Sequence, residues 1–152
     1  MPSRREGLRR NVAWTELHRR SRVARQPRGV VHMGMVATKS LDKPDEVREF
    51  PNGAAAMISI GSTLIGRAQM EPGWRWSNDV KPIAGTDLCM VLHKGYCISG
   101  TMTVKAEDGT ETQVGAGDGY VIEPGHDAWV VGDEPYVAVD FSEQMAEYAK
   151  AR

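Results

Sequence analysis

The feature that most constrains the fold is a series of short β-prone runs that begins near Glu46 and continues almost to the C-terminus. Turn residues separate these runs at close intervals, which is typical of an antiparallel β-sandwich or β-barrel. In one run apolar residues alternate with polar ones, which predicts a single buried face. The expected strands are Ala54–Ile60, Leu64–Met70, Cys89–Ile98, Met102–Ala106, Glu111–Val114, Tyr120–Ile122, Ala128–Val131 and Tyr136–Phe141.

Turns and a terminal helix complete the expected domain. Ser99-Gly100 and Asp108-Gly109 stand where tight hairpins need positive φ angles or Asx chemistry. Residues 142–152 are predicted to form a short helix that starts at Ser142 and has Met145 and Tyr148 on one side. A helix of this length is unstable alone, so we expect it to dock on the barrel.

The N-terminal segment differs sharply from the rest of the chain. Residues 1–32 contain nine arginines, no lysine and only two glutamates, whereas the whole chain has a formal net charge of −1. Three interpretations stay open: a disordered tail, upstream sequence before a true start at Met33 or Met35, or an arm that binds nucleic acid or directs targeting. We expect a basic, flexible segment over residues 1–45 and a barrel with its helix over residues 46–152.

Length and composition favour one soluble domain. The 152 residues suffice for a single core, and no apolar run approaches the roughly 20 residues of a membrane span. With no signal-peptide core, the expected location is cytoplasmic. Cys89 and Cys97 fall eight residues apart on one expected strand, about 26 Å in extended chain, so we expect two free thiols.

Several common catalytic motifs are absent from the sequence. It has no GxSxG elbow, no P-loop, and no GxGxxG that opens a helix after a strand. HEXXH and CxxC are absent as well. Function must therefore be sought in residues that the barrel brings together.

Two stretches suggest which barrel this is. The first begins at Gly73 in EPGWRWSNDVKP and resumes in HKGYCISG, which ends at Gly100; the second, GDGYVIEPGHDAW, runs from Gly117 to Trp129. They resemble the paired motifs of the cupin superfamily, and in particular small single-domain bacterial cupins of poorly defined function. The resemblance implies an all-β, antiparallel jelly-roll (cupin) β-barrel, and it implies a homodimer.

The cupin motifs carry metal ligands, and this chain departs from them. The first motif runs Gly, five residues, His-x-His, a short gap, Glu, six residues, Gly; the second runs Gly, five residues, Pro-x-Gly, two residues, His. Counted from Gly73, the two histidine positions hold Asp79 and Lys81, and His93 holds the glutamate position before Gly100. In the second motif the histidine position falls on Ala128, and His126 stands two residues earlier.

These positions still allow a metal site. Asp79, His93 and His126 would supply one carboxylate and two imidazoles, a suitable ligand set for iron, manganese or zinc. Lys81 would share a face with Asp79 if that segment were extended, and an ammonium group there would oppose a cation. Cys89 lies four residues from His93, about 13 Å along a straight strand, so we expect it to be excluded as a ligand.

Aromatic and basic residues near the motifs are candidates for ligand binding. Trp74, Trp76 and Trp129 could stack on a planar ligand, and Arg75 or Lys81 could bind an acidic group. The alternative for the tryptophans is that they plug the barrel end or form a dimer interface.

Three functions follow from this sequence. The first is a metal-dependent enzyme on a small molecule, of oxygenase, isomerase or lyase type. The second is a metal-free binder or sensor of a small ligand in the same cavity. The third, and least favoured, is a protein that docks on nucleic acid through its arginine-rich segment.

Overall fold

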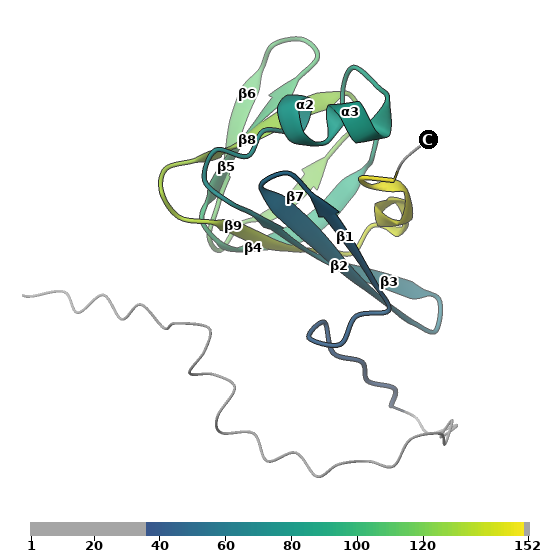
Figure 1. Cartoon of the computed structure of the whole chain (residues 1–152). Coiled ribbons are helices and arrows are strands. Elements are labelled where there is room, and N and C mark those ends of the chain that lie inside the picture. The colour runs from purple at the N-terminus through teal and green to yellow at the C-terminus, as the bar shows by residue number, and fades with distance from the viewer. Residues whose placement is uncertain (1–35, 151–152) are drawn as a thin grey trace, which may run out of the picture. The chain divides into compact units, whose positions relative to one another are not determined.

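The computed structural model describes residues 36–150 of the chain (Figure 1). The predictions about the basic segment 1–32, and about a start at Met33 or Met35, fall outside the described residues. Within them, Leu41 and Asp42 already contact Arg67 through hydrogen bonds of 3.1 and 3.0 Å. In the described range, no helix is long or apolar enough to cross a membrane.

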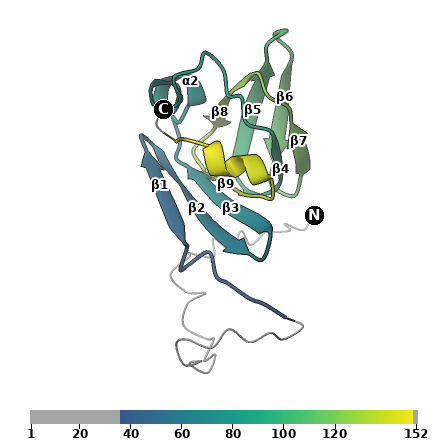
Figure 2. The same cartoon turned by 90° about the vertical axis from the view of Figure 1, so that its right-hand side faces the viewer.

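Two antiparallel sheets make up the domain (Figures 1 and 2). The larger sheet has the strand order β1-β2-β3-β9-β4-β7 and the smaller the order β6-β5-β8. Side chains from both sheets enter one hydrophobic core. The strands are β1 (Glu46–Phe50), β2 (Gly53–Ile60), β3 (Thr63–Met70), β4 (His93–Ser99), β5 (Thr101–Ala106), β6 (Glu111–Gly115), β7 (Gly119–Ile122), β8 (His126–Val131) and β9 (Tyr136–Asp140).

The predicted all-β jelly roll is confirmed, with two differences in its strands. Strand β1 was not predicted; it pairs with β2 across a turn in which Asn52 has a φ of 57°. The run Cys89–Ile98 was expected as one strand, but β4 begins only at His93. Gly100 has the expected positive φ, +74°, and a Cβ there would lie 2.5 Å from the carbonyl oxygen of Pro135. The turn is not a hairpin, however, because β4 and β5 belong to different sheets.

Two short helices replace the extended segment that was expected around Asp79. They are α2 (Trp76–Asp79) and α3 (Lys81–Ala84). Pro82 stands in the first turn of α3, and Gly85 ends it with a φ of 68°, the usual asymmetry of helix ends. The expectation that Asp79 and Lys81 share one face of a strand is therefore wrong.

The C-terminal segment docks on the barrel as expected but is shorter. Its helix, η1 (Glu143–Glu147), is a 3₁₀-helix whose cap, Ser142, accepts a hydrogen bond from the backbone N–H of Gln144. Met145 and Tyr148 are 1% and 3% exposed, so both side chains enter the core. Figure 2 shows η1 across the barrel, near β3 and β9. Tyr148 thereby comes edge-on to His93, with ring centroids 5.5 Å apart.

Candidate metal centre

Cys89, His93 and His126 bring one sulfur and two imidazole rings together inside the barrel. One ligand atom from each lies within 4.8 Å of the other two. The sulfur of Cys89 is 3.6 Å from Nε2 of His93, and the two imidazole centroids are 5.4 Å apart. Cys89 and His126 are 2% and 4% exposed.

The backbone explains how Cys89 reaches the histidines. His93 opens β4 and His126 opens β8, whereas Cys89 precedes β4 and forms an isolated bridge with His126. Its N–H donates to the carbonyl of His126 at 2.8 Å, and its carbonyl accepts from Gly125 at 2.7 Å. The exclusion of Cys89 is thus wrong: residues 90–92 belong to no strand, so the straight-strand spacing of about 13 Å does not apply.

Both imidazoles are oriented by a hydrogen bond at Nδ1. His126 Nδ1 donates to the carbonyl of Glu123 at 2.7 Å, because a carbonyl can only accept. His93 Nδ1 donates to Oδ2 of Asp140 at 2.8 Å, and Asp140 is 2% exposed. In both residues Nε2 is left for the centre of the cluster, which is the usual arrangement of histidines that bind a metal.

Proton affinities in the cluster are strongly shifted. Burial raises the pKa of the Cys89 thiol, but hydrogen bonds from His126 and His93 outweigh it and bring that pKa down to about 6. Burial lowers the pKa of His93, yet its hydrogen bonds to Asp140 and Cys89 raise it to about 9. The thiolate form that a metal requires is therefore already favoured by the surroundings.

The donor set fits a tetrahedral metal. With a metal–sulfur bond of about 2.3 Å and a metal–nitrogen bond of about 2.05 Å, the sulfur–nitrogen edge of a tetrahedron is about 3.6 Å. The observed separation of Cys89 Sγ and His93 Nε2 is 3.6 Å. Three protein ligands would leave the fourth position free, as in catalytic rather than structural sites.

Asp79, predicted as a ligand, is engaged elsewhere. Its Oδ2 accepts the backbone N–H of Arg75 at 2.8 Å, and its Oδ1 accepts from the amide of Asn52 at 3.2 Å. The carboxylate thus satisfies a free donor at the start of α2. The structure brings together the predicted ligands His93 and His126, adds Cys89, and leaves Asp79 out of this cluster.

The predicted basic ligand-binding residues are also paired. Lys81 forms an ion pair of 3.0 Å with the exposed Asp87. Arg75 forms one of 2.9 Å with Asp127, and its guanidinium lies 4.5 Å from the ring centroid of Trp129. That Arg75, Lys81 and Trp129 bind a ligand stays a prediction.

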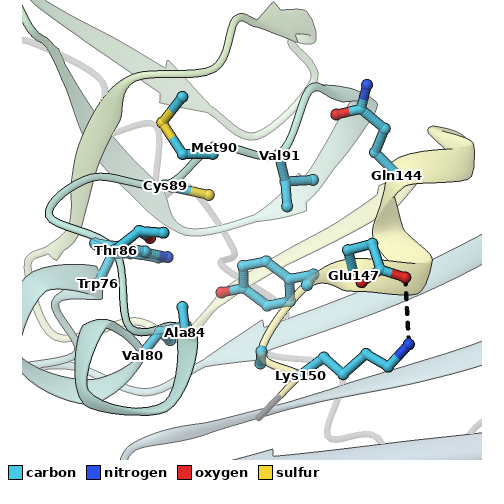
Figure 3. A pocket seen from close by; sticks show the side chains of 12 residues that line it. Trp76, Val80, Ala84, Thr86, Cys89, Met90, Val91, Gln144, Glu147 and Lys150 are labelled. Atoms are coloured by element: carbon cyan, nitrogen blue, oxygen red, sulfur yellow. Dashed lines mark hydrogen bonds and ion pairs between the residues drawn. The ribbon is translucent and has the colours of Figure 1, made fainter. Parts of the chain in front are cut away.

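Two spaces meet at the cluster. An inner cavity of about 40 Å³ is lined by His93, His126, Trp74, Trp76 and Tyr148, among others. An outer pocket of about 200 Å³ is lined by Cys89, Trp76 and Tyr148, among others. Figure 3 shows Cys89, Trp76 and Val80 on one side of this outer pocket, with Gln144, Glu147 and Lys150 on the other.

A third space lies to one side of the cluster. This groove of about 450 Å³ follows β5, β6 and β7 and includes His126 but neither Cys89 nor His93. The complete set of three ligand atoms is therefore reached only where the inner cavity and the outer pocket meet.

Comparisons with known proteins concern the fold. No family model and no curated protein matches the chain. Solved structures do match, among them an oxalate decarboxylase from Lactobacillus farciminis, with 15% identity over 70% of this chain and 33% of that one and a TM-score of 0.49. A protein with a double-stranded β-helix domain from Klebsiella pneumoniae has 19% identity over 69% and 87% of the two chains, with a TM-score of 0.45.

A cupin-like protein from Thermotoga maritima has 16% identity over 64% of this chain and 74% of that one, with a TM-score of 0.45. At these identities a likeness concerns the fold alone. The strand order itself is that of a jelly roll: two antiparallel sheets enclose one core, and the chain crosses from one sheet to the other between β4 and β5, β6 and β7, β7 and β8, and β8 and β9. By its own strand order, this chain has the jelly-roll fold of a cupin.

With the cupin fold in place, the first motif can be aligned again. The extra residues lie in α2 and α3, before the His-x-His position rather than after it. Counting back from His93 across a short gap then puts Cys89 in the second histidine position. The sequence did contain this signal, in Pro82 and Gly85, which mark the short helix that displaces the count from Gly73.

Proposed function

We propose that this cupin binds one divalent metal ion through Cys89, His93 and His126 and acts on a small molecule at the free coordination position. The observation that carries the proposal is the convergence of three ligand atoms within 4.8 Å of one another in a buried place. Both imidazoles turn Nε2 toward the cluster, and the thiol already favours its thiolate form. Because the pKa of His93 is raised to about 9, a metal would have to displace the proton on its Nε2.

The donor set bears on which metal is bound. A thiolate in place of the predicted carboxylate favours zinc, and next iron, over manganese, which prefers oxygen ligands. A bound zinc ion would polarise an oxygen atom of the substrate without any redox change. Of the predicted reaction types, isomerase or lyase chemistry therefore agrees better with this centre than oxygenase chemistry.

The residues of the chain hold this centre in place. Asp140 fixes the ring of His93 and supports its basicity, while the carbonyl of Glu123 fixes His126. Met145 and Tyr148 help to close the barrel over the inner cavity, which limits the access of water. The small size of both spaces indicates a substrate below drug size.

A second function is favoured by a specific contact. Without metal, Cys89, His93 and Asp140 form a thiolate, an imidazolium and a carboxylate in series, which is the arrangement of a nucleophilic cysteine. This chain of contacts does not include His126. In a metal-free binder or sensor of a small ligand, by contrast, none of these groups would need to react.

Metal analysis of protein purified without an affinity tag tests the first proposal. We expect about one equivalent of metal in the wild type, and loss of that metal in Cys89→Ser, His93→Ala and His126→Ala. Asp79→Asn is the matched control and should keep the metal. A folded wild-type protein that takes up no zinc, iron or manganese after dialysis against each would overturn the proposal.

A further inference from the structure

Among the described residues, four polar groups around the centre are buried without a hydrogen-bond partner. They are the indole Nε1 atoms of Trp74 and Trp76 and the hydroxyls of Tyr148 and Tyr136. The four residues are 2%, 2%, 3% and 1% exposed. Because an unpaired buried donor costs free energy, each such group in a folded protein calls for an explanation.

These groups are located around the candidate metal centre. All four residues line the inner cavity, and of these Trp76 and Tyr148 also line the outer pocket, next to Cys89. Cys89 borders the outer pocket, whereas His93 and His126 border the inner cavity. The free donors and the three metal ligands therefore lie at the same boundary between the two spaces.

We infer that this boundary is a subsite for a carboxylate, and that the ligand of the centre is a small monocarboxylic acid whose apolar part occupies the outer pocket. This inference rests on the proposed metal centre. Trp76 and Tyr148 would donate hydrogen bonds to the carboxylate oxygens, and Trp74 would donate from the far side of the inner cavity.

The chemistry of the donors excludes cationic ligands. An indole N–H can only donate, so it selects an acceptor and rejects ammonium or guanidinium groups. The hydroxyl of Tyr148 can likewise donate a hydrogen bond to an anionic oxygen. A divalent metal with a single thiolate ligand keeps a net positive charge, which further favours an anionic oxygen.

The outer pocket determines the rest of the ligand. Apolar side chains such as Val80, Ala84 and Val91 line much of it, and Glu147 and Lys150, which form an ion pair of 3.3 Å, also border it (Figure 3). Its volume of about 200 Å³ equals that of about seven water molecules in the liquid. An unbranched or compact acid of four to seven carbons, as an order of magnitude, would fill it.

The test is a titration of the zinc-loaded protein with acetate, butyrate and hexanoate, followed by calorimetry and by tryptophan fluorescence. We expect affinity to rise with chain length, because each added methylene is buried in the outer pocket. Hexanamide and hexanol, which lack the charge, should bind at least about tenfold more weakly than hexanoate. Equal affinities for hexanoate, hexanamide and hexanol, or no binding of hexanoate, would overturn the inference.

Tyr148→Phe gives a sharper test, with Tyr96→Phe as its control on the outer surface, where Tyr96 is 49% exposed. Removing an unpaired buried hydroxyl should leave stability unchanged or raise it, yet weaken hexanoate binding about tenfold. Trp76→Phe should weaken binding similarly. A purely structural hydroxyl would instead show lower stability and unchanged hexanoate affinity in Tyr148→Phe.

Metal content separates the two proposals. If the Tyr148 and Trp76 variants keep one equivalent of zinc and lose hexanoate, both proposals are supported. If the wild type holds zinc but binds no carboxylate, only the subsite is wrong. If the wild type holds no metal, the centre itself is wrong, and the subsite inference is overturned with it.

Discussion

Two buried regions of this barrel contain polar side chains, and they differ in where the polar atoms of these side chains point. At the start of α2, Asp79 and Asp127 accept backbone N–H groups of Arg75 and Ser77. Where β4 and β8 begin, the ligand atoms of Cys89, His93 and His126 lie close to one another. The first region directs its carboxylates at backbone donors, whereas the second directs one sulfur and two nitrogen atoms at one another.

The difference shows how structure and function can be separated in a buried polar cluster. A carboxylate whose two oxygens each accept a hydrogen bond from the protein, as those of Asp79 do, is held in place by the fold rather than turned toward a ligand. Two imidazoles that are each held by a hydrogen bond at Nδ1, and whose Nε2 atoms lie near a cysteine sulfur, are arranged to bind a cation. The predictions below test whether the two regions differ in this way.

The largest expected effect compares Cys89→Ser with Asp79→Asn. Loss of a thiolate ligand should weaken zinc binding more than about 100-fold, since even the supporting residues of metal sites contribute 10–100-fold. Asp79→Asn should keep zinc affinity and instead lower the free energy of unfolding by about 1–3 kcal/mol. Competition with a chromophoric chelator and urea unfolding measure the two effects; the opposite pattern would assign the metal to Asp79.

Asp140→Asn should have a smaller effect on the same centre. Its carboxylate accepts from His93 Nδ1 at 2.8 Å and from the backbone of Ser142 at 2.7 Å. Without the negative charge, we expect zinc affinity to fall about 10–100-fold while the barrel stays folded. The same chelator competition measures it, and unchanged affinity would show that Asp140 acts only as a cap of the C-terminal segment.

The two buried cysteines should differ in reactivity once metal is removed. The pKa of Cys89 is lowered to about 6 by its histidine contacts, whereas burial raises that of Cys97. At pH 7 we expect Cys89 to react with iodoacetamide at least about tenfold faster than Cys97. Its rate should fall as the pH drops through about 6, because the thiolate is then protonated.

Zinc provides the control for this experiment, since it should protect Cys89 from iodoacetamide. Peptide mapping of the labelled protein identifies which thiol reacts. Equal rates for Cys89 and Cys97, or a rate for Cys89 that rises only above pH 8, would contradict the contacts described for the cluster.

The smallest effect is expected at Arg75. Its guanidinium pairs with Asp127 and stacks on Trp129, but its side chain is 42% exposed. Arg75→Ala should therefore cost about 1 kcal/mol of stability and leave zinc affinity within about twofold. A large loss of ligand binding in this variant, with stability retained, would restore the predicted role of Arg75 as a clamp for an acidic group.

The fold could be predicted because its signals are local. Alternating residues, Gly100 and Gly109 at tight turns, and the paired cupin motifs each act over a few positions. Strand β1 was missed although the Asn52-Gly53 pair is a typical hairpin signal.

The site could be predicted only in part because its members depend on irregular backbone. His93 and His126 open strands, so the motif spacing finds them. Cys89 depends on the bend at residues 90–92 and on its bridge to His126. Asp79 was predicted as a ligand by counting from Gly73, but Pro82 and Gly85 bound a helix nearby, and the carboxylate accepts the backbone N–H of Arg75 at the start of α2 instead.

X-ray absorption spectroscopy at the metal edge of the zinc-loaded protein tests the central claim most directly. If Cys89, His93 and His126 bind the zinc, the spectrum will show one sulfur ligand at about 2.3 Å and two imidazole nitrogens at about 2.0–2.1 Å, and the sulfur will be lost in Cys89→Ser. A shell of nitrogen and oxygen alone, unchanged in Cys89→Ser and altered in Asp79→Asn, would contradict it.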